Sequence, residues 1–299
     1  TTYIMKHIIA SSLVASSFLF TSCGDKKVVE SKADAAVAES VAETTPVEAA
    51  QNWQKDLTGG QVSNLWSSLS ADYQSDLNKL ANNLGDKVDS EVYNEAMTTL
   101  GSVSNLLKSK KTMILEILKD NAPEGKEDDL AKIEQSYDSI VGIINTIATS
   151  DAKTTEGLKS MDLGKLLGDL QGHTKELSKL SSLAGDKFKK FQEVKFSLVS
   201  ESGDSAAINV TSEGNDKEVK LIKKDGNWLP EDMVNKWPEM MVEANKAIAE
   251  IGDMKPEQKQ QALMGLMMLK STVQSLEKAK TKEDMMQTVQ GLMGMFGMK

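Results

Sequence analysis

Arginine is absent from this chain of 299 residues, so its 35 basic side chains are all lysines. The planar guanidinium of arginine binds phosphates, carboxylates and guanine edges through paired hydrogen bonds, whereas a lysine ammonium acts as a point charge. The 44 acidic side chains outnumber the lysines and give a formal net charge of −9. Binding to a phosphate backbone depends on positive charge. The sequence therefore predicts no nucleic-acid partner.

Cysteine and histidine are almost as scarce, with one cysteine, Cys23, and two histidines, His7 and His173. A structural zinc site needs four ligands of these types, and a nucleophilic cysteine needs a histidine beside it. The sequence accordingly predicts no catalytic residue, no cofactor and no His/Cys metal centre. His173 lies in residues 171–176, where glycine is expected to end one helix before another begins, so we interpret it as an exposed or capping residue.

The beginning of the chain has the composition of an export signal. Residues 5–7, Met-Lys-His, form a short basic segment, and residues 8–20 form an apolar run. A helix that spans a bilayer needs about 20 apolar residues, so this run is typical of a secretory signal peptide. The small residues Thr21 and Ser22 then precede Cys23.

Residues 19–23, Leu-Phe-Thr-Ser-Cys, resemble the lipobox of bacterial lipoproteins, with Phe20 where leucine is usual. The resemblance implies a signal peptide over residues 1–22 that is removed before Cys23, and a diacylglyceryl group on the cysteine sulfur. Two or three acyl chains hold a protein firmly on a membrane. We therefore expect a protein of the bacterial cell envelope whose membrane partner is bound through lipid on Cys23. Gly24, where inner-membrane lipoproteins carry aspartate, favours the outer membrane.

Residues 23–50 are predicted to be a disordered tether, because they are rich in Ala, Val, Glu and Lys and contain no aromatic residue. From residue 51 the apolar residues recur with the period of an α-helix, and Ser70 has the position of a helix N-cap. The clearest stripe comprises Leu130, Ile133, Tyr137, Ile140, Ile144 and Ile147. Weaker helices are expected at 158–170 and 174–183. Since each apolar face must be covered by another, residues 51–190 are predicted to form a helical bundle.

The period changes to two in residues 192–230, where apolar and polar residues alternate between glycine-containing turns. This pattern predicts an antiparallel meander of three strands and a short fourth. Residues 223–228 resemble the Asp-Gly-x-Trp hairpin of exported proteins of the cystatin-like or NTF2-like class, which implies helices packed into a curved sheet. The predicted fold class is therefore α+β and predominantly helical, with residues 51–299 forming one domain.

The C-terminal segment 238–299 is predicted to be helical, beginning at Trp237-Pro238 with proline in the first turn. Twelve of the 16 methionines lie from Met233 onward. Methionine fills irregular cores, but it also forms adaptable surfaces for a partner protein or for lipid. A third hypothesis is Cu(I) binding by the thioethers of Met264, Met267 and Met268, which have helical spacing.

Three hypotheses of function follow from the sequence. The first is a lipid-anchored envelope lipoprotein that acts as a non-catalytic interaction or structural module, with a protein partner at the Met-rich C-terminal helices. The second is a hydrolase of an envelope polymer, whose Asp and Glu residues come together only in the folded protein. The third is a Met-dependent Cu(I)-binding protein.

Overall fold

The computed structural model describes residues 44–123, 125–178, 190–251 and 254–295. Most of these residues are helical, and one four-stranded antiparallel sheet interrupts the helices, which confirms the predicted α+β class. In chain order the elements are α2 (Pro46–Thr58), α3 (Val62–Ser67), α4 (Ala71–Lys87), α5 (Ser90–Ser109), α6 (Lys111–Asp120), α7 (Glu127–Thr149), η1 (Asp151–Lys153), α8 (Thr155–Leu158), α9 (Leu163–Ser178), β1 (Lys195–Ser202), β2 (Ser205–Ser212), β3 (Asn215–Lys224), β4 (Asn227–Pro230), α11 (Glu231–Glu250), α12 (Pro256–Lys278) and α13 (Lys282–Met295).

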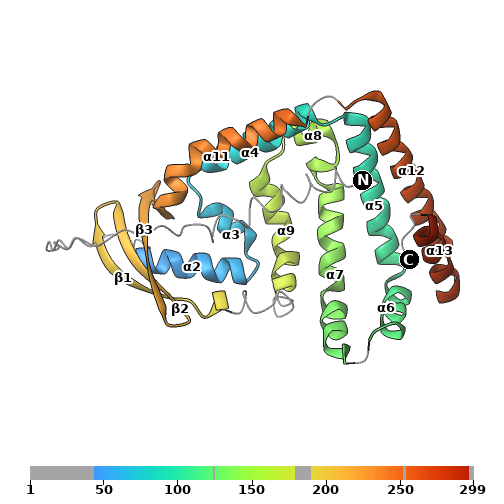
Figure 1. Cartoon of the computed structure of the whole chain (residues 1–299), viewed down its shortest axis with the longest axis horizontal. Coiled ribbons are helices and arrows are strands. Elements are labelled where there is room, and N and C mark those ends of the chain that lie inside the picture. The colour runs from blue at the N-terminus through green and yellow to red at the C-terminus, as the bar shows by residue number, and fades with distance from the viewer. Residues whose placement is uncertain (1–43, 124, 179–189, 252–253, 296–299) are drawn as a thin grey trace.

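The elements are arranged from a sheet at one end of the molecule to the C-terminal helices at the other (Figure 1). The helices α9, α7, α5 and α12 each contact the next, so they form a row, and α13 packs on α12. α4 and α11 run together along one side and join this row to the sheet (Figure 1). α12 therefore lies at the end of the row, with a side that faces away from α5.

The sheet has the strand order β1-β2-β3-β4, as the predicted meander requires. Tight turns join the strands at positions where the backbone has positive φ: Gly203, Glu213-Gly214 and Asp225-Gly226. Glycine adopts this conformation without steric cost, which explains why the turns could be predicted from the sequence. A bulge in β1 between Leu198 and Ser200 interrupts its pairing with β2.

Both faces of the sheet carry packed residues. One face contributes Ile208, Leu221 and Trp228 to a core that includes Ala49 of α2. The other face contributes Leu229, which is fully buried against Tyr73 of α4 and Trp237 of α11. The sheet is thus held between α2 and the α4–α11 pair.

The predicted tether is too long, because α2 begins inside residues 23–50, at Pro46. Thr45 caps this helix: its hydroxyl accepts from the N–H of Glu48 at 3.2 Å, and the Glu48 carboxylate accepts from the N–H of Thr45 at 2.9 Å. Val47, Ala49 and Ala50 then pack against the sheet. The apolar residues that composition alone assigned to a tether bury one side of a helix, and residues 23–43 lie outside the described residues.

The clearest predicted stripe is confirmed in part. It lies on α7, where Tyr137 and Val141 are buried and Tyr137 donates to the carbonyl of Leu107 at 2.9 Å. Ile140, by contrast, is exposed. Ser70 does precede α4, yet its buried hydroxyl makes no capping hydrogen bond.

The predicted boundary between two helices at residues 171–176 is wrong. α9 runs without interruption from Leu163 to Ser178, with His173 in its second half. Glycine at 172 is exposed there, so it costs helix propensity without breaking the helix. The helix predicted at 174–183 falls partly outside the described residues.

The predicted start of the next helix at Trp237-Pro238 is also wrong, because α11 begins at Glu231. Pro230 lies at its N-cap in an extended conformation, and the acidic Glu231 and Asp232 occupy the first turn, where the helix dipole favours negative charge. Pro238 therefore lies inside α11.

The contact between α7 and α9 depends on a small residue at position 142. A Cβ atom on Gly142 would overlap the imidazole ring of His173, whereas a Cβ on Gly168 of α9 would meet no atom within 4 Å. We expect Gly142→Ala to lower the free energy of unfolding by about 1–3 kcal/mol, as overpacking does. Gly168→Ala should instead raise it by up to about 1 kcal/mol through helix propensity. Urea unfolding measures both.

His173→Ala in the Gly142→Ala background should recover most of the lost stability, because it removes the ring that the new methyl group meets. Equal stability of Gly142→Ala and Gly168→Ala would contradict this contact.

Candidate interaction surface on α12

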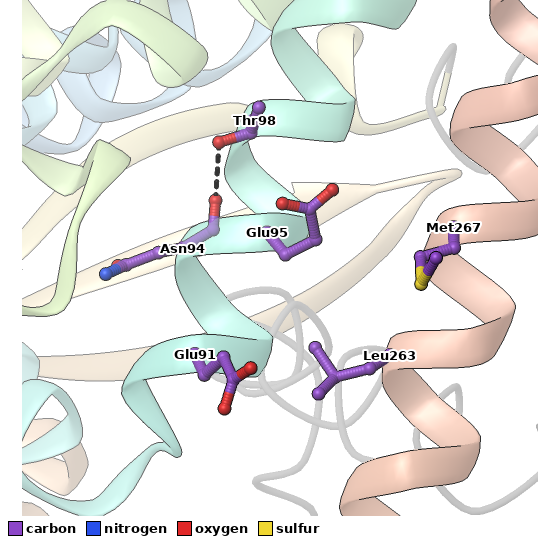
Figure 2. Close-up of a pocket in the computed structure, with 6 residues that line it drawn as sticks. All are labelled: Glu91, Asn94, Glu95, Thr98, Leu263 and Met267. Carbon is purple, nitrogen blue, oxygen red and sulfur yellow. Dashed lines mark hydrogen bonds between the residues drawn. The ribbon is translucent and has the colours of Figure 1, made fainter.

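A hollow of about 490 Å³ lies between α5 and α12. Figure 2 shows its two walls: α5 contributes Glu91, Asn94, Glu95 and Thr98, and α12 contributes Leu263 and Met267. One wall is therefore polar and acidic and the other is apolar. Two carboxylates one helical turn apart are the nearest approach in this hollow to the acid and base pair that a hydrolase would need.

Lysines of α12 bind both of these carboxylates. The Nζ atom of Lys259 lies 2.8 Å from Glu91 and that of Lys270 lies 2.8 Å from Glu95. The two ion pairs hold α12 on α5 at both ends of the hollow, and Val273, which is buried, supports the same side of α12. The arrangement keeps the two carboxylates paired with ammonium groups and aligns the helices.

A third carboxylate strengthens the first of these contacts. Asp89 precedes α5, and its Oδ1 accepts from the N–H groups of Glu91 and Val92 at 3.0 and 3.1 Å. Its Oδ2 lies 3.1 Å from the Nζ atom of Lys259. Burial alone would raise the pKa of the Asp89 carboxyl, but the Val92 N–H and the Lys259 ammonium stabilise the charged form and together hold this pKa below its ordinary value.

A second hollow, of about 320 Å³, lies beside α4, β3 and α11. Its lining includes an aromatic stack, in which the ring centres of Tyr73 and Trp237 lie 4.0 Å apart. The Trp237 indole donates to Asp76 at 3.0 Å, and Lys224 lies 3.4 Å from Asp72 and 4.3 Å from the centre of the Tyr73 ring. Burial raises the pKa of the Tyr73 phenol. These contacts join α4, β3 and α11, and they leave both carboxylates with partners.

The methionines divide into packed and exposed groups. Met233, Met240 and Met241 surround the Tyr73–Trp237 stack, and Met285 of α13 is buried. The candidate Cu(I) ligands differ from these: Met264 is 53%, Met267 65% and Met268 42% exposed. Filling of the core thus explains methionines of α11 and α13, while those of α12 lie on the surface.

These three methionines belong to what we call the outer stripe of α12, and Met267 lies at its edge, where it also borders the hollow against α5. Its members recur at intervals of three and four residues, and all are exposed: Glu257, Gln260, Gln261, Met264, Met267, Met268, Ser271, Gln274, Ser275 and Lys278. Only the first and last members are charged. Large exposed apolar side chains gathered on one helix face are typical of an interaction surface.

The Cu(I) hypothesis requires thioethers on one helix face, and spacing places Met264, Met267 and Met268 there. Their exposure leaves them on open surface rather than in an enclosed site. Among the residues that the structure describes, no group of three His, Cys, Asp or Glu side chains could hold a metal ion. Cu(I) binding stays a hypothesis from the sequence.

The other predicted site residue, Cys23, lies outside the described residues. Within the described ranges, no helix has the length and apolar character required to cross a bilayer. The chain matches no protein-family model, and neither a curated protein sequence nor a solved structure was found to be similar to it.

The sequence contained a signal for the outer stripe, but it did not show which side of the helix faces solvent. Residues 260–269 contain no charged side chain, and this run could have marked an exposed apolar helix face. Periodicity could not tell which side of α12 faces solvent, because the inner side is defined by Lys259 and Lys270 reaching carboxylates far away in the sequence.

The pairing of Asp89 with Lys259 predicts how stability depends on pH. Because the folded state lowers the Asp89 pKa, its carboxylate stabilises the fold above the ordinary aspartate pKa of about 3.9, and this contribution is lost as the pH falls through the lower folded-state value. Asp89→Asn keeps a good N-cap and removes the charge. At neutral pH it should lower the free energy of unfolding by up to about 1 kcal/mol.

The difference between Asp89→Asn and the parent should disappear in acid, which denaturant unfolding at several pH values measures. Glu277→Gln is the control, because exposed Glu277 makes no ion pair with any residue in the described part of the chain. A constant difference between Asp89→Asn and the parent at all pH values would refute the ionic contribution.

Proposed function

We propose that this protein is a lipid-anchored component of the bacterial cell envelope that acts as a non-catalytic interaction module. The observation that carries the interaction role is the outer stripe of α12, where Met264, Met267 and Met268 are exposed together. The lipobox-like residues 19–23 supply the reason for the anchor. A tethered domain with an exposed, adaptable helix face is suited to holding a partner protein near a membrane.

The place where the tether would enter the domain supports this arrangement. Thr44, the first described residue, accepts a hydrogen bond from the Trp228 indole at 3.0 Å, so the chain enters beside the sheet. Twenty residues lie between Cys23 and Thr44, and the predicted tether, as a coil of this length, would span about 25 Å on average. α12 lies at the opposite end of the molecule (Figure 1). The anchor would therefore leave the outer stripe facing away from its attachment point.

The carboxylates of the two hollows favour the non-catalytic role over a hydrolase. Glu91 and Glu95 bind lysines of α12, and Asp76 accepts from an indole. A general acid or base must reach a proton of its substrate directly, whereas these carboxylates contact ammonium and indole groups of the protein itself. The contacts of these residues are explained by packing between helices.

The anchoring part of the proposal predicts the behaviour of Cys23→Ala in cells. Without the thiol there is no attachment point for the diacylglyceryl group, so we expect loss of labelled palmitate incorporation and release of the protein into the soluble periplasmic fraction. Ser22→Ala keeps a small side chain before the cysteine and should retain both lipid and membrane attachment. A bare thiol on the parent protein, detected by mass spectrometry, would disprove the anchor.

The interaction part predicts where a partner is captured. A photoreactive benzophenone amino acid introduced at Met264 should form cross-linked products in intact cells. The same group at Val242, which is 69% exposed on α11, should form few, because that position lies outside the outer stripe. Equal yields at the two positions would show that the outer stripe is not a preferred binding surface.

A further inference from the structure

We infer that the partner of the outer stripe is a second copy of this chain, bound through α12 against α12 in antiparallel orientation. The inference rests on the proposed interaction role of this face and adds the identity and geometry of the partner. It is carried by the distribution of charge along α12.

The outer stripe has the spacing of a helix–helix seam. Its members fall into three sets that each repeat every seven residues: 257, 264, 271 and 278; 260, 267 and 274; and 261, 268 and 275. Two helices pack along such a stripe when apolar residues repeat with this period. Methionine occupies all three positions of the central heptad, so the apolar contact is concentrated in the middle of α12.

The two ends of the outer stripe carry opposite charges. Glu257 lies in the first turn of α12, Lys278 is its last residue, and the eight members between them are neutral. Neither Glu257 nor Lys278 makes an ion pair with any residue in ranges 44–123, 125–178, 190–251 and 254–295, and both are exposed. A partner surface with the opposite order of charges would pair with both.

A second α12 in antiparallel orientation presents that order. When Met267 of one copy faces Met268 of the other across a two-fold axis, Met264 faces Ser271 and Glu257 faces Lys278. Each copy then makes the same contacts, as a symmetric dimer requires. A parallel pair would place Glu257 against Glu257 and Lys278 against Lys278, which like-charge repulsion disfavours.

The net charge of the molecule favours this face over others for contact between copies. The whole chain carries −9, so two copies repel each other on average. The outer stripe has one positive and one negative side chain and is neutral in sum. Contact between the methionines buries apolar surface and brings together no like charges.

A membrane anchor would strengthen association through such a narrow surface. Two domains held on one membrane meet at a higher effective concentration than in solution, so a weak contact becomes populated. Self-association is therefore expected to be modest for protein in dilute solution and more complete on the membrane.

Chemical cross-linking tests the orientation directly. Gln261 and Gln274 are exposed, neutral members of the outer stripe that face each other between antiparallel copies. In the lipidated full chain on membranes, the double variant Gln261→Cys/Gln274→Cys should give a covalent dimer with a short bis-maleimide. Either single variant should not, because two copies of one position lie about 20 Å apart along antiparallel helices.

Each other result of this experiment has a definite meaning. Dimers from the single variants would show a parallel pair and overturn the antiparallel geometry. If the double variant is cross-linked to a different protein, self-association is overturned but the interaction role is kept. If it gives no cross-linked product and sedimentation shows a monomeric mass, the dimer is overturned. Labelling of the parent chain by a maleimide would report an unlipidated Cys23, so failure of the anchor is detected separately.

Charge reversal gives an independent test, measured as the dimer dissociation constant by sedimentation equilibrium of the lipidated protein in detergent micelles. Glu257→Lys or Lys278→Glu turns two attractive contacts into repulsive ones and should weaken the dimer roughly tenfold. The double variant Glu257→Lys/Lys278→Glu restores opposite charges and should regain most of the affinity. Val242→Lys changes the charge of the molecule outside the outer stripe and should alter the dissociation constant little. If reversal of both charges weakens the dimer as much as the two single changes together, the end contacts do not exist.

Discussion

The ion pairs between lysines of α12 and carboxylates at the start of α5 determine which side of α12 faces solvent at the end of the molecule opposite the sheet. Lys259 and Lys270 point toward α5, where Asp89, Glu91 and Glu95 bind them. Two of the three lysines of α12 are thereby used for contact within the chain. The outward side is consequently left with methionine, glutamine and serine, and a chain rich in charge acquires a neutral strip on its surface.

Aromatic side chains play the corresponding role at the other end. Tyr73 and Trp237 stack between α4 and α11, and Leu229 of β4 is buried against them. Large rings bury much apolar surface for each residue, which allows a chain with few aromatics to join a small sheet to long helices. The structure therefore has an ionic contact that orients α12 and an apolar contact that fixes the sheet.

The fold class could be predicted because local signals dominate it. Turns such as Asp225-Gly226 need positive φ, and the residues that tolerate it are few. Boundaries were less predictable where a local signal is decided by distant packing. The cap at Thr45 is visible in the sequence, but the helix that it begins is stabilised by burial of Ala49 on a sheet far along the chain. Exposed glycine at 172 likewise does not break α9, because the helix continues to pack on α7.

The outer stripe, like the fold, was predictable only as far as local sequence signals decide it. The neutral run 260–269 and the methionines at 264, 267 and 268 are visible in the sequence, whereas their exposure depends on which carboxylates the neighbouring lysines reach.

The hydrogen bond from Trp228 to Thr44 has a further mechanical consequence. Tension applied to the segment that precedes Thr44 would be transmitted first to the indole of β4 and to the cap of α2. The sheet would then bear the force before the row of long helices α9, α7, α5 and α12.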